Sequence, residues 1–541
     1  MTGSCGAQIE ESSDRPAPRN RSISATADRA ADGLRRHKYV VLIFFSCLYL
    51  LATFYRASRK LFWFDELCSV YVSRLPDMAS VWSALKHGMD FNPPLFYAVT
   101  RLSESLFGEG HIATRLPAIL GFWIFCLCLF RFVSCRTSVL AGLISMLFPL
   151  VTTAYFYSYE ARPHGVVLGL CGIALLCWQA GIHSRRRRGW WFLGLFGALF
   201  CAILNHTYAM MLVIPLALAE SLRSISLRRF DWTAWLAIAC SWSAVLFSIP
   251  LWRAARANVP ATFFPAKVSA LAKSYQFHLA PAAGVLAAWL FLYFVFKFAA
   301  SGRAEPAKRE QSLEIFEVVA VIGFVFMPFF TFLLARLTGA PIIERYSIST
   351  VAGFACLFGI VAARRAAVGL GVLAILVLQI GINLFEYVHT ATIIEPSSSI
   401  ALDTTPSTLA NSYQMMETVT DKNLPIVILD DLESLPIIYY APPELASRMV
   451  YVLPPGRNVA GELIIRGNEF YLGSRPAETM ANFLSLHDTF LVQSNVRSLY
   501  RLNDFIHQGG DVRIESASTD SFLASVTFKK SHGEAASNTL Q

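Results

Sequence analysis

Long uninterrupted apolar runs are the feature that most constrains what this chain can fold into. A helix needs roughly 20 mostly apolar residues to cross a bilayer, and we count eleven runs of about that kind along the sequence. Only 15% of the 541 residues are charged, against about 25% in soluble domains. We therefore predict a polytopic α-helical membrane protein. The predicted spans are 39–56, 116–133, 138–156, 164–182, 190–205, 207–222, 233–251, 282–300, 316–335, 347–363 and 367–388.

The connections between these runs indicate how the chain is oriented. If the N-terminus is cytoplasmic, every even-numbered connection is basic, as in Arg185 to Arg188, and cytoplasmic loops are enriched in Lys and Arg. The net charge of +9 then reflects these loops, and no nucleic-acid partner is indicated. We expect residues 1–38 to be a disordered cytoplasmic N-terminus, and the odd number of spans places the C-terminus outside.

Three segments on the predicted outer side are longer than turns. The first outer loop, 57–115, has helical spacing of apolar residues at 78–89 and 95–107, as in helices that lie in the membrane interface. The second is the loop 252–281. The third is the tail 391–541, which follows the membrane domain 39–390 and reads as a small α/β domain. Its predicted strands are 426–429, 437–440, 449–452 and 489–492.

Two adjacent acids, Asp65 and Glu66, lie just outside the first span and end an aromatic run. A carboxylate near lipid is costly unless it is used or paired. In such a setting its pKa can be raised, so that it serves as a general base. The alternative is a pair of solvated loop acids. We interpret both residues as candidate catalytic groups.

The next two polar clusters fall on the same predicted side. Asn92 is a good helix N-cap and Pro93 and Pro94 favour the first turn of a helix, so we read this segment as structural. Glu160 and Arg162 follow the third span. They could pair with each other, or they could bind a sugar hydroxyl and a phosphate.

The last two clusters are His206 with Tyr208 and Arg345 with Tyr346, again on the predicted outer side. A lone histidine is usually structural. The forked donors of an arginine suit phosphate recognition, although an arginine at this depth could also reach lipid headgroups. Acids, arginines and a histidine at one membrane face indicate a site for a phosphate-bearing, lipid-borne substrate.

Taken in order and spacing, these motifs resemble the GT-C superfamily of membrane glycosyltransferases. The resemblance is to bacterial enzymes of the protein-mannosyltransferase and aminoarabinose-transferase kind (glycosyltransferase family 39-like, including rhizobial core-sugar transferases), and it covers roughly 39–390. It rests on Phe64-Asp65-Glu66, Asn92-Pro93-Pro94-Leu95, Tyr157-Ser158-Tyr159-Glu160-Ala161-Arg162, His206 with Tyr208, and Glu344-Arg345-Tyr346. The chain departs from the pattern at Pro163-His164, where relatives often carry an aromatic residue.

The resemblance implies a polyprenyl-phosphate-linked sugar as donor and Asp65 as the general base. We expect a hexosyl- or pentosyltransferase that moves the sugar, with inversion, to an acceptor hydroxyl. Arg345, helped by Arg162 or His206, would face the departing phosphate. Glu66 or Glu160 would bind sugar hydroxyls or orient an arginine.

The expected partners are the lipid-linked donor, membrane lipids, and an envelope glycan, lipid or protein as acceptor. The expected location is a bacterial inner membrane with the site and the C-terminal domain in the periplasm. No cofactor is firmly indicated; Asp65, Glu160 and His206 could hold a divalent metal only if the fold gathers them.

Two other classes of function remain open on the sequence. A transporter or flippase would place acids at the centres of spans and show inverted repeats, and we find neither. A membrane-anchored binding protein would work through its tail, so that its spans could be replaced and Asp65 would be dispensable.

Overall fold

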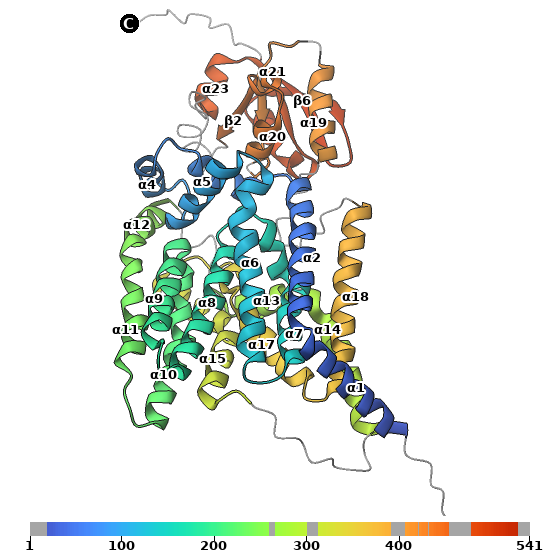
Figure 1. Cartoon of the computed structure of the whole chain (residues 1–541). Helices are drawn as coiled ribbons and strands as arrows, with labels where there is room; N and C mark the ends of the chain where they lie inside the picture. The colour runs from blue at the N-terminus through green and yellow to red at the C-terminus, as the bar shows by residue number, and fades with distance from the viewer. Residues whose placement is uncertain are drawn as a thin grey trace, which may run out of the picture.

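The computed structural model describes residues 19–258, 266–299, 312–390, 406–419, 421–430, 432–453 and 478–528. Figure 1 shows a bundle of long helices with a small α/β domain at one end and helix α1 at the other. Helices α4 and α5 of the first loop lie at the end of the bundle that carries that domain. The protein is thus a polytopic helical membrane protein with a C-terminal extramembrane domain.

Within the described residues, eight helical segments are long and apolar enough to cross a membrane. Five are single helices: α2 (Lys38–Arg59), α6 (His111–Ser134), α8 (His164–His183), α9 (Arg188–Asn205) and α18 (Ala366–Thr390). The segment Thr207–Ser226 joins η3 (Thr207–Leu212) and α10 (Val213–Ser226). The segment Trp232–Ala254 joins α11 (Trp232–Ser241), η4 (Trp242–Phe247) and the start of α12 (Ile249–Asn258). The segment Val268–Phe298 joins α13 (Val268–Leu279), η5 (Ala280–Ala282) and α14 (Ala283–Ala299).

The remaining three predicted spans are broken or short. One is bent by 73° between α7–η1 (Val139–Leu147, Phe148–Val151) and η2 (Thr153–Tyr159), and another by 56° between α15 (Ile315–Val325) and α16 (Met327–Thr338). Counting each bent pair as one span gives up to 10. The eleventh, 347–363, is α17 (Thr350–Ala362), whose 13 residues fall short of the roughly 20 needed.

Small residues let two of the spans pack closely. A Cβ at Gly121 of α6 would lie 2.5 Å from the Gly165 carbonyl oxygen of α8, and one at Gly169 would lie 2.6 Å from the Gly121 carbonyl oxygen. Because lipid is as apolar as the side chains, close backbone approach is a main source of helix association in membranes. The glycines therefore hold the N-terminal half of α8 against α6.

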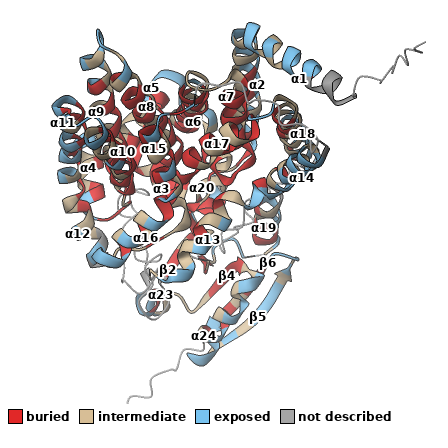
Figure 2. Cartoon of the chain, turned by 90° about the horizontal axis from the view of Figure 1, so that it is seen from below, coloured by how far each residue is buried: buried red, intermediate tan, exposed pale blue. Residues whose placement is uncertain are grey.

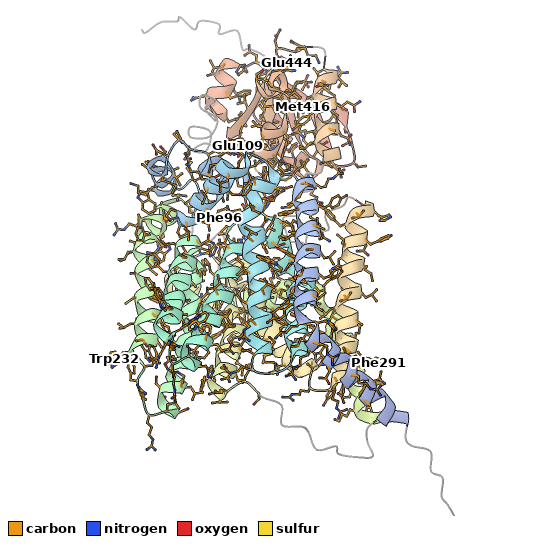
Figure 3. All side chains as sticks on the ribbon, viewed as in Figure 1. Phe96, Glu109, Trp232, Phe291, Met416 and Glu444 are labelled. Atoms are coloured by element: carbon orange, nitrogen blue, oxygen red, sulfur yellow. The ribbon has the colours of Figure 1, made fainter. Side chains whose placement is uncertain are left out.

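The outer surface of the bundle is apolar, as lipid contact requires. Figure 2 shows the buried residues inside the bundle and exposed residues around it. Figure 3 labels Trp232 and Phe291 at the edge of the bundle, and both are large, exposed apolar side chains. Together with the apolar helices, this surface identifies an integral membrane protein.

The first outer loop forms three helices: α3 (Phe64–Ser73), α4 (Met78–Lys86) and α5 (Leu95–Phe107). The helices predicted at 78–89 and 95–107 are confirmed. Asn92, however, does not cap α5, because Pro94 occupies the N-cap position and no side chain caps the helix there. The loop predicted at 252–281 is also partly helical, since α12 and α13 cover its two ends.

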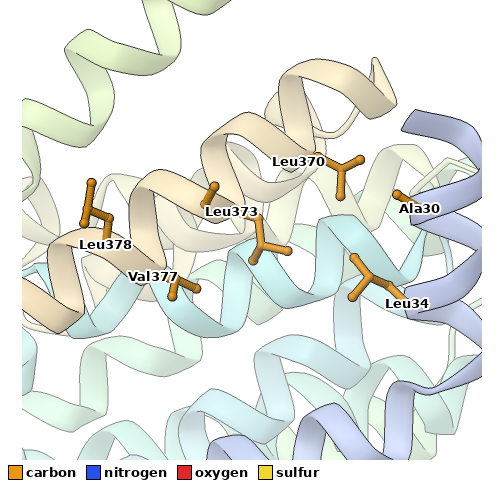
Figure 4. Close-up of a pocket in the computed structure, with 7 residues that line it drawn as sticks. Ala30, Leu34, Leu370, Leu373, Val377 and Leu378 are labelled. Carbon is orange, nitrogen blue, oxygen red and sulfur yellow. The ribbon is translucent and has the colours of Figure 1, made fainter. Parts of the chain in front are cut away.

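The predicted disorder of the N-terminus is wrong for residues 19–36, which form α1 (Arg19–Arg36); residues 1–18 lie outside the described part. Ala27, Ala31 and Leu34 have helical spacing; Ala27 is buried, and Ala31 and Leu34 pack on the bundle core, which explains the helix. Between α1 and α18 lies an open apolar groove of about 580 Å³ (Figure 4). It is lined by Ala30, Leu34, Leu370, Leu373, Ala374, Val377 and Leu378.

In its described residues the C-terminal domain contains a six-stranded sheet with the order β3-β2-β1-β4-β6-β5. Its strands are β1 (Ile426–Ile428), β2 (Met449–Leu453), β3 (Glu478–Thr479), β4 (Thr489–Asn495), β5 (Gly510–Ala517) and β6 (Ser521–Phe528). The first four strands in this order run parallel, and β6 is antiparallel to both β4 and β5. The helices include α19 (Pro406–Thr418), α20 (Ser434–Tyr440), α21 (Pro443–Ala446), α23 (Met480–Leu486) and α24 (Leu502–His507).

One predicted strand is wrong, because 437–440 belongs to α20. Asp430 at the end of β1 accepts the backbone N–H groups of Leu432 and Glu433 at 2.9 and 3.2 Å, which turns the chain into a helix. The β-branched pair Ile437-Ile438 then packs into the core of the domain from a helix. The second acid of this stretch, Asp431, lies outside the described residues.

Candidate active site

The polar clusters singled out in the sequence meet at the end of the bundle that carries the C-terminal domain. Asp65 lies in the first turn of α3, Arg162 lies just before α8, and Arg345 lies in the short helix η6 (Glu344–Ser347). These residues are as much as 280 positions apart in the chain. Their common location agrees with the prediction that they share one membrane face.

Asp65 and Arg345 form an ion pair. Arg345 Nη2 donates to Asp65 Oδ2 at 2.7 Å, and 18% and 19% of the arginine and aspartate side chains are exposed. The Arg345 guanidinium also lies 5.9 Å from the ring centre of Trp63. Burial alone would lower the pKa of Arg345, but the Asp65 carboxylate raises it above its ordinary value. The candidate base is thus held by a permanent cation that a phosphate could attract.

Arg162 is held by a different acid. Its Nη1 donates to Asp90 Oδ2 at 2.7 Å and to the Asp65 carbonyl oxygen and Ser69 Oγ at 3.0 Å each. Asp90 Oδ1 in turn accepts the Asn92 side-chain amide at 3.1 Å. The sequence interpretation did not include Asp90, although it lies two residues before Asn92 in the same polar cluster.

Glu160 does not pair with Arg162. Its Oε1 accepts Trp63 Nε1 at 2.6 Å, and Lys60 Nζ lies 3.7 Å away. The carboxylate therefore ties the segment before α8 to the chain just before α3. This contact brings Glu160 to the same aromatic side chain that lies beside Arg345.

Glu66 lies in a closed ionic network and is fully buried. Its two oxygens accept Arg115 Nε and Nη2 at 2.8 and 2.9 Å, Lys60 Nζ at 3.0 Å and the Ala161 backbone N–H at 2.6 Å. Burial opposes its ionisation, but Arg115 and Lys60 outweigh this and hold the pKa of Glu66 below its ordinary value. This arrangement favours a structural role for Glu66, which joins α3, α6 and the segment 157–162. It does not favour contact with a substrate. Arg115 and Lys60 were not singled out from the sequence.

A row of five rings includes His206, on which both arginines act electrostatically. Consecutive ring centres are 4.7 Å apart for Tyr157 and His164, 5.3 Å for His164 and His206, 5.3 Å for His206 and Tyr346, and 4.5 Å for Tyr346 and Tyr208. We call these five side chains the ring row. It brings together residues from four separate segments of the chain.

Within this row, His206 and Tyr208 are held by backbone contacts. His206 Nδ1 accepts the Tyr208 N–H at 3.2 Å, and the Tyr208 hydroxyl donates to the Pro341 carbonyl. Burial, followed by Arg162 and Arg345, lowers the pKa of His206 to about 3. His206 is thus a neutral group near pH 7, and the positive charge of the site comes from the arginines.

His278 contacts the short helix that carries Arg345. It was missed in the sequence, where its segment was predicted to be a loop. Its Nε2 lies 3.0 Å from the Glu344 carbonyl oxygen and 3.3 Å from Ser347 Oγ, at the two ends of η6. Helix α13 thereby fixes the short helix that carries Arg345. No local sequence signal marks this role.

No group of three or more His, Cys, Asp or Glu side chains placed to hold a metal ion occurs among the described residues. Asp65, Glu160 and His206 have separate partners, namely Arg345, Trp63 and the Tyr208 backbone. The possibility of a divalent metal raised from the sequence is not tested by this arrangement.

Comparisons with known proteins bear on the family and on the fold. Residues 91–252 match the family described as dolichyl-phosphate-mannose-protein mannosyltransferase. The fold is similar to the crystal structure of ArnT from Cupriavidus metallidurans bound to undecaprenyl phosphate (14% identity, TM-score 0.51) and to the same enzyme in the apo state (13% identity, TM-score 0.53). Each alignment covers 90% of this chain and 98% of the ArnT chain. No curated protein sequence matches the chain.

The family match over residues 91–252 and the ArnT-like fold both support a membrane glycosyltransferase of the GT-C superfamily. The matched segment contains Asn92, Glu160, Arg162 and His206, while the fold similarity extends over nearly the whole chain. The resemblance stated from the motifs is therefore confirmed.

Proposed function

We propose that this protein transfers a sugar from a polyprenyl-phosphate donor to an acceptor hydroxyl, with Asp65 as the general base and inversion at the anomeric carbon. The observation that carries the proposal is the ion pair between Asp65 and Arg345 beside Arg162. It sets a carboxylate able to take a proton next to two cations able to hold a phosphate. The ArnT relative solved with undecaprenyl phosphate supports this class of donor.

The reaction follows from these charges. The donor phosphate attracts the guanidinium of Arg345, which frees the Asp65 carboxylate. Asp65 then removes the proton of the acceptor hydroxyl as its oxygen bonds to the anomeric carbon, and the bond from that carbon to the phosphate oxygen breaks. Base catalysis of this kind contributes about 10²–10⁴-fold, and each well-placed donor to the departing phosphate contributes a few kcal/mol.

A single displacement explains the proposed inversion, because the acceptor attacks opposite the phosphate. A retaining mechanism would need a second carboxylate as nucleophile across the scissile bond. Glu66 is a poor candidate for that second role, since Arg115, Lys60 and the Ala161 N–H occupy its oxygens. Asp65 therefore acts alone on the acceptor.

The site would face the periplasm of a bacterium, with the N-terminus in the cytoplasm. The basic run Arg185 to Arg188 connects α8 and α9 at the end of the bundle away from the C-terminal domain (Figure 1). Because cytoplasmic loops are enriched in such residues, the site end is the outer one. The acceptor there would be an envelope glycan, lipid or protein.

The test uses the full chain in detergent with polyprenyl-phosphate sugars and mixed envelope acceptors, and it follows release of polyprenyl phosphate. We expect release by the wild type and at least 100-fold less by Asp65→Asn. Glu444→Gln changes an acid on the C-terminal domain (Figure 3) and serves as the matched control. Equal release by wild type and Asp65→Asn would remove Asp65 as the base. Transport of the intact lipid-linked sugar across vesicles without release would favour a flippase.

A further inference from the structure

His164, the first residue of α8, is a buried polar group that the proposed mechanism does not use. Its exposed fraction is 3%, and within the described part of the chain neither ring nitrogen has a hydrogen-bond partner. Buried polar groups in folded proteins nearly always have such partners, because burying an unpaired one costs free energy. Both nitrogens of this imidazole are therefore available to a ligand, and its position beside the site decides which ligand that is.

The position of this imidazole indicates that it contacts the same ligand that the arginines would bind. Its ring is the second member of the ring row, between Tyr157 and His206. It follows Arg162 by two residues, and Arg345 is among the charged groups that act on it electrostatically. A group bound between the arginines and the ring row would therefore lie against His164.

The backbone at this point cannot easily move to give His164 another partner. A Cβ on the next residue, Gly165, would lie 2.6 Å from the Ala118 carbonyl oxygen of α6. The close contact between α6 and α8 thus fixes the first turn of α8. His164 is held in place by helix packing, and its nitrogens are left available.

The chemistry of the ring selects the kind of group it can bind. A neutral imidazole offers one donor and one acceptor, whereas a phosphate oxygen can only accept. Arg345 and Arg162 already supply donors and positive charge for the phosphate. A hydroxyl both donates and accepts, so it can satisfy either nitrogen of His164, and the aromatic faces of the ring row suit the apolar face of a sugar ring.

We propose that His164 hydrogen-bonds a hydroxyl of the donor's sugar and so helps to select which sugar is transferred. This inference rests on the proposed function, since it places the sugar next to a phosphate held by Arg345. Its distinctive consequence is that His164 contributes to binding of the sugar but not of the phosphate. The two parts of the donor can therefore be tested separately.

The experiment measures binding to the purified full chain in detergent, which requires no acceptor. The probes are undecaprenyl phosphate and undecaprenyl phosphate linked to mannose, glucose, galactose or 4-amino-4-deoxyarabinose. We expect the wild type to bind one sugar-linked probe more tightly than undecaprenyl phosphate. His164→Phe keeps a ring of similar shape but removes both nitrogens. It should lower the affinity for that probe by about 3- to 10-fold, as expected for one hydrogen bond. The affinity for undecaprenyl phosphate should stay within twofold of the wild-type value.

Two further variants separate sugar recognition from other effects. Ser248→Ala removes a hydroxyl that is equally buried and has no partner in the described residues, and it should change neither affinity. His164→Gln keeps a donor and an acceptor and should retain part of the sugar preference. If His164→Phe does not fold, His164→Leu compared with His164→Gln provides the same contrast.

The outcomes distinguish this inference from the proposed function. If His164→Phe lowers the affinity for undecaprenyl phosphate and for the sugar-linked probe equally, sugar recognition by His164 is overturned. The same holds if neither affinity changes. Failure of the wild type to bind undecaprenyl phosphate at all would instead overturn the proposed donor, and the inference with it. Loss of sugar preference alone would support His164 as a residue that determines specificity.

Discussion

Glu66 and Asp65 are adjacent in the chain, but the structure predicts opposite consequences for neutralising them. Glu66→Gln would leave Arg115 buried without its counter-charge and Lys60 with only Glu160, 3.7 Å away; in the wild type both bond to the Glu66 carboxylate at 3.0 Å or less. Removing one partner from a buried ion pair costs about 3–5 kcal/mol. For a chain of 541 residues, 1 kcal/mol corresponds to roughly 1 °C in Tm, so we expect a loss of about 3–5 °C.

Asp65→Asn should behave differently, because its ion pair with Arg345 is partly exposed and asparagine can still accept a hydrogen bond. Its cost in stability should be smaller than that of Glu66→Gln, while sugar transfer should fall by at least 100-fold. Thermal melting in detergent and release of polyprenyl phosphate, measured on the same samples, check both expectations. A Glu66→Gln protein that melts like the wild type but has lost transfer as completely as Asp65→Asn would refute this division of roles.

Further predictions concern four parts of the structure. Asp90 accepts a hydrogen bond from Arg162 at 2.7 Å, so Asp90→Asn should hold Arg162 less firmly. The KM for the donor should rise by about tenfold with a smaller change in kcat, as measured by initial-rate kinetics. Tyr440→Phe removes the hydroxyl that accepts the Phe62 N–H at 2.8 Å. It should cost about 1 kcal/mol and lower kcat, because this contact lies just before the helix that carries Asp65. Tyr413→Phe, whose hydroxyl donates to Ile437 within the C-terminal domain, should lower stability without that loss of kcat. Gly121→Ala should separate α6 from α8 and cost about 1–3 kcal/mol, visible as a lower Tm. Because the folded pKa of Glu66 is depressed, its stabilisation should be complete above about pH 5 and lost only as the pH falls below the unfolded value of about 4.3. Glu66→Gln should lack this acid-dependent part when Tm is followed against pH.

Several elements were predicted correctly because their signal is local. The apolar runs predicted the positions of the helices in the membrane domain, and apolar spacing predicted α4 and α5. The predictions failed where a distant contact decides the outcome. The helix at 437–440 depends on turn contacts to Asp430 and on the core of the C-terminal domain, and α1 depends on packing against the bundle.

The supporting residues of the site were harder to find than the clusters themselves. Arg115 lies within α6 and looks like any charge near a membrane surface, yet it bonds to Glu66 and to the carbonyls of Ala57, Lys60 and Leu61. His278 contacts Glu344, 66 residues further along the chain. No spacing rule in a single sequence reveals a partner at such a distance.

The sequence by itself indicated that this chain crosses a membrane many times and that its candidate site clusters lie at one face. Both follow from hydropathy and charge, which are properties of short segments. Only the tertiary structure decided which acid pairs with which cation. Neighbouring residues on a helix point about 100° apart, so Asp65 and Glu66 meet different elements: Asp65 meets Arg345 from η6, and Glu66 meets Arg115 from α6. That divergence separates the candidate base from the residue that holds its helix in place.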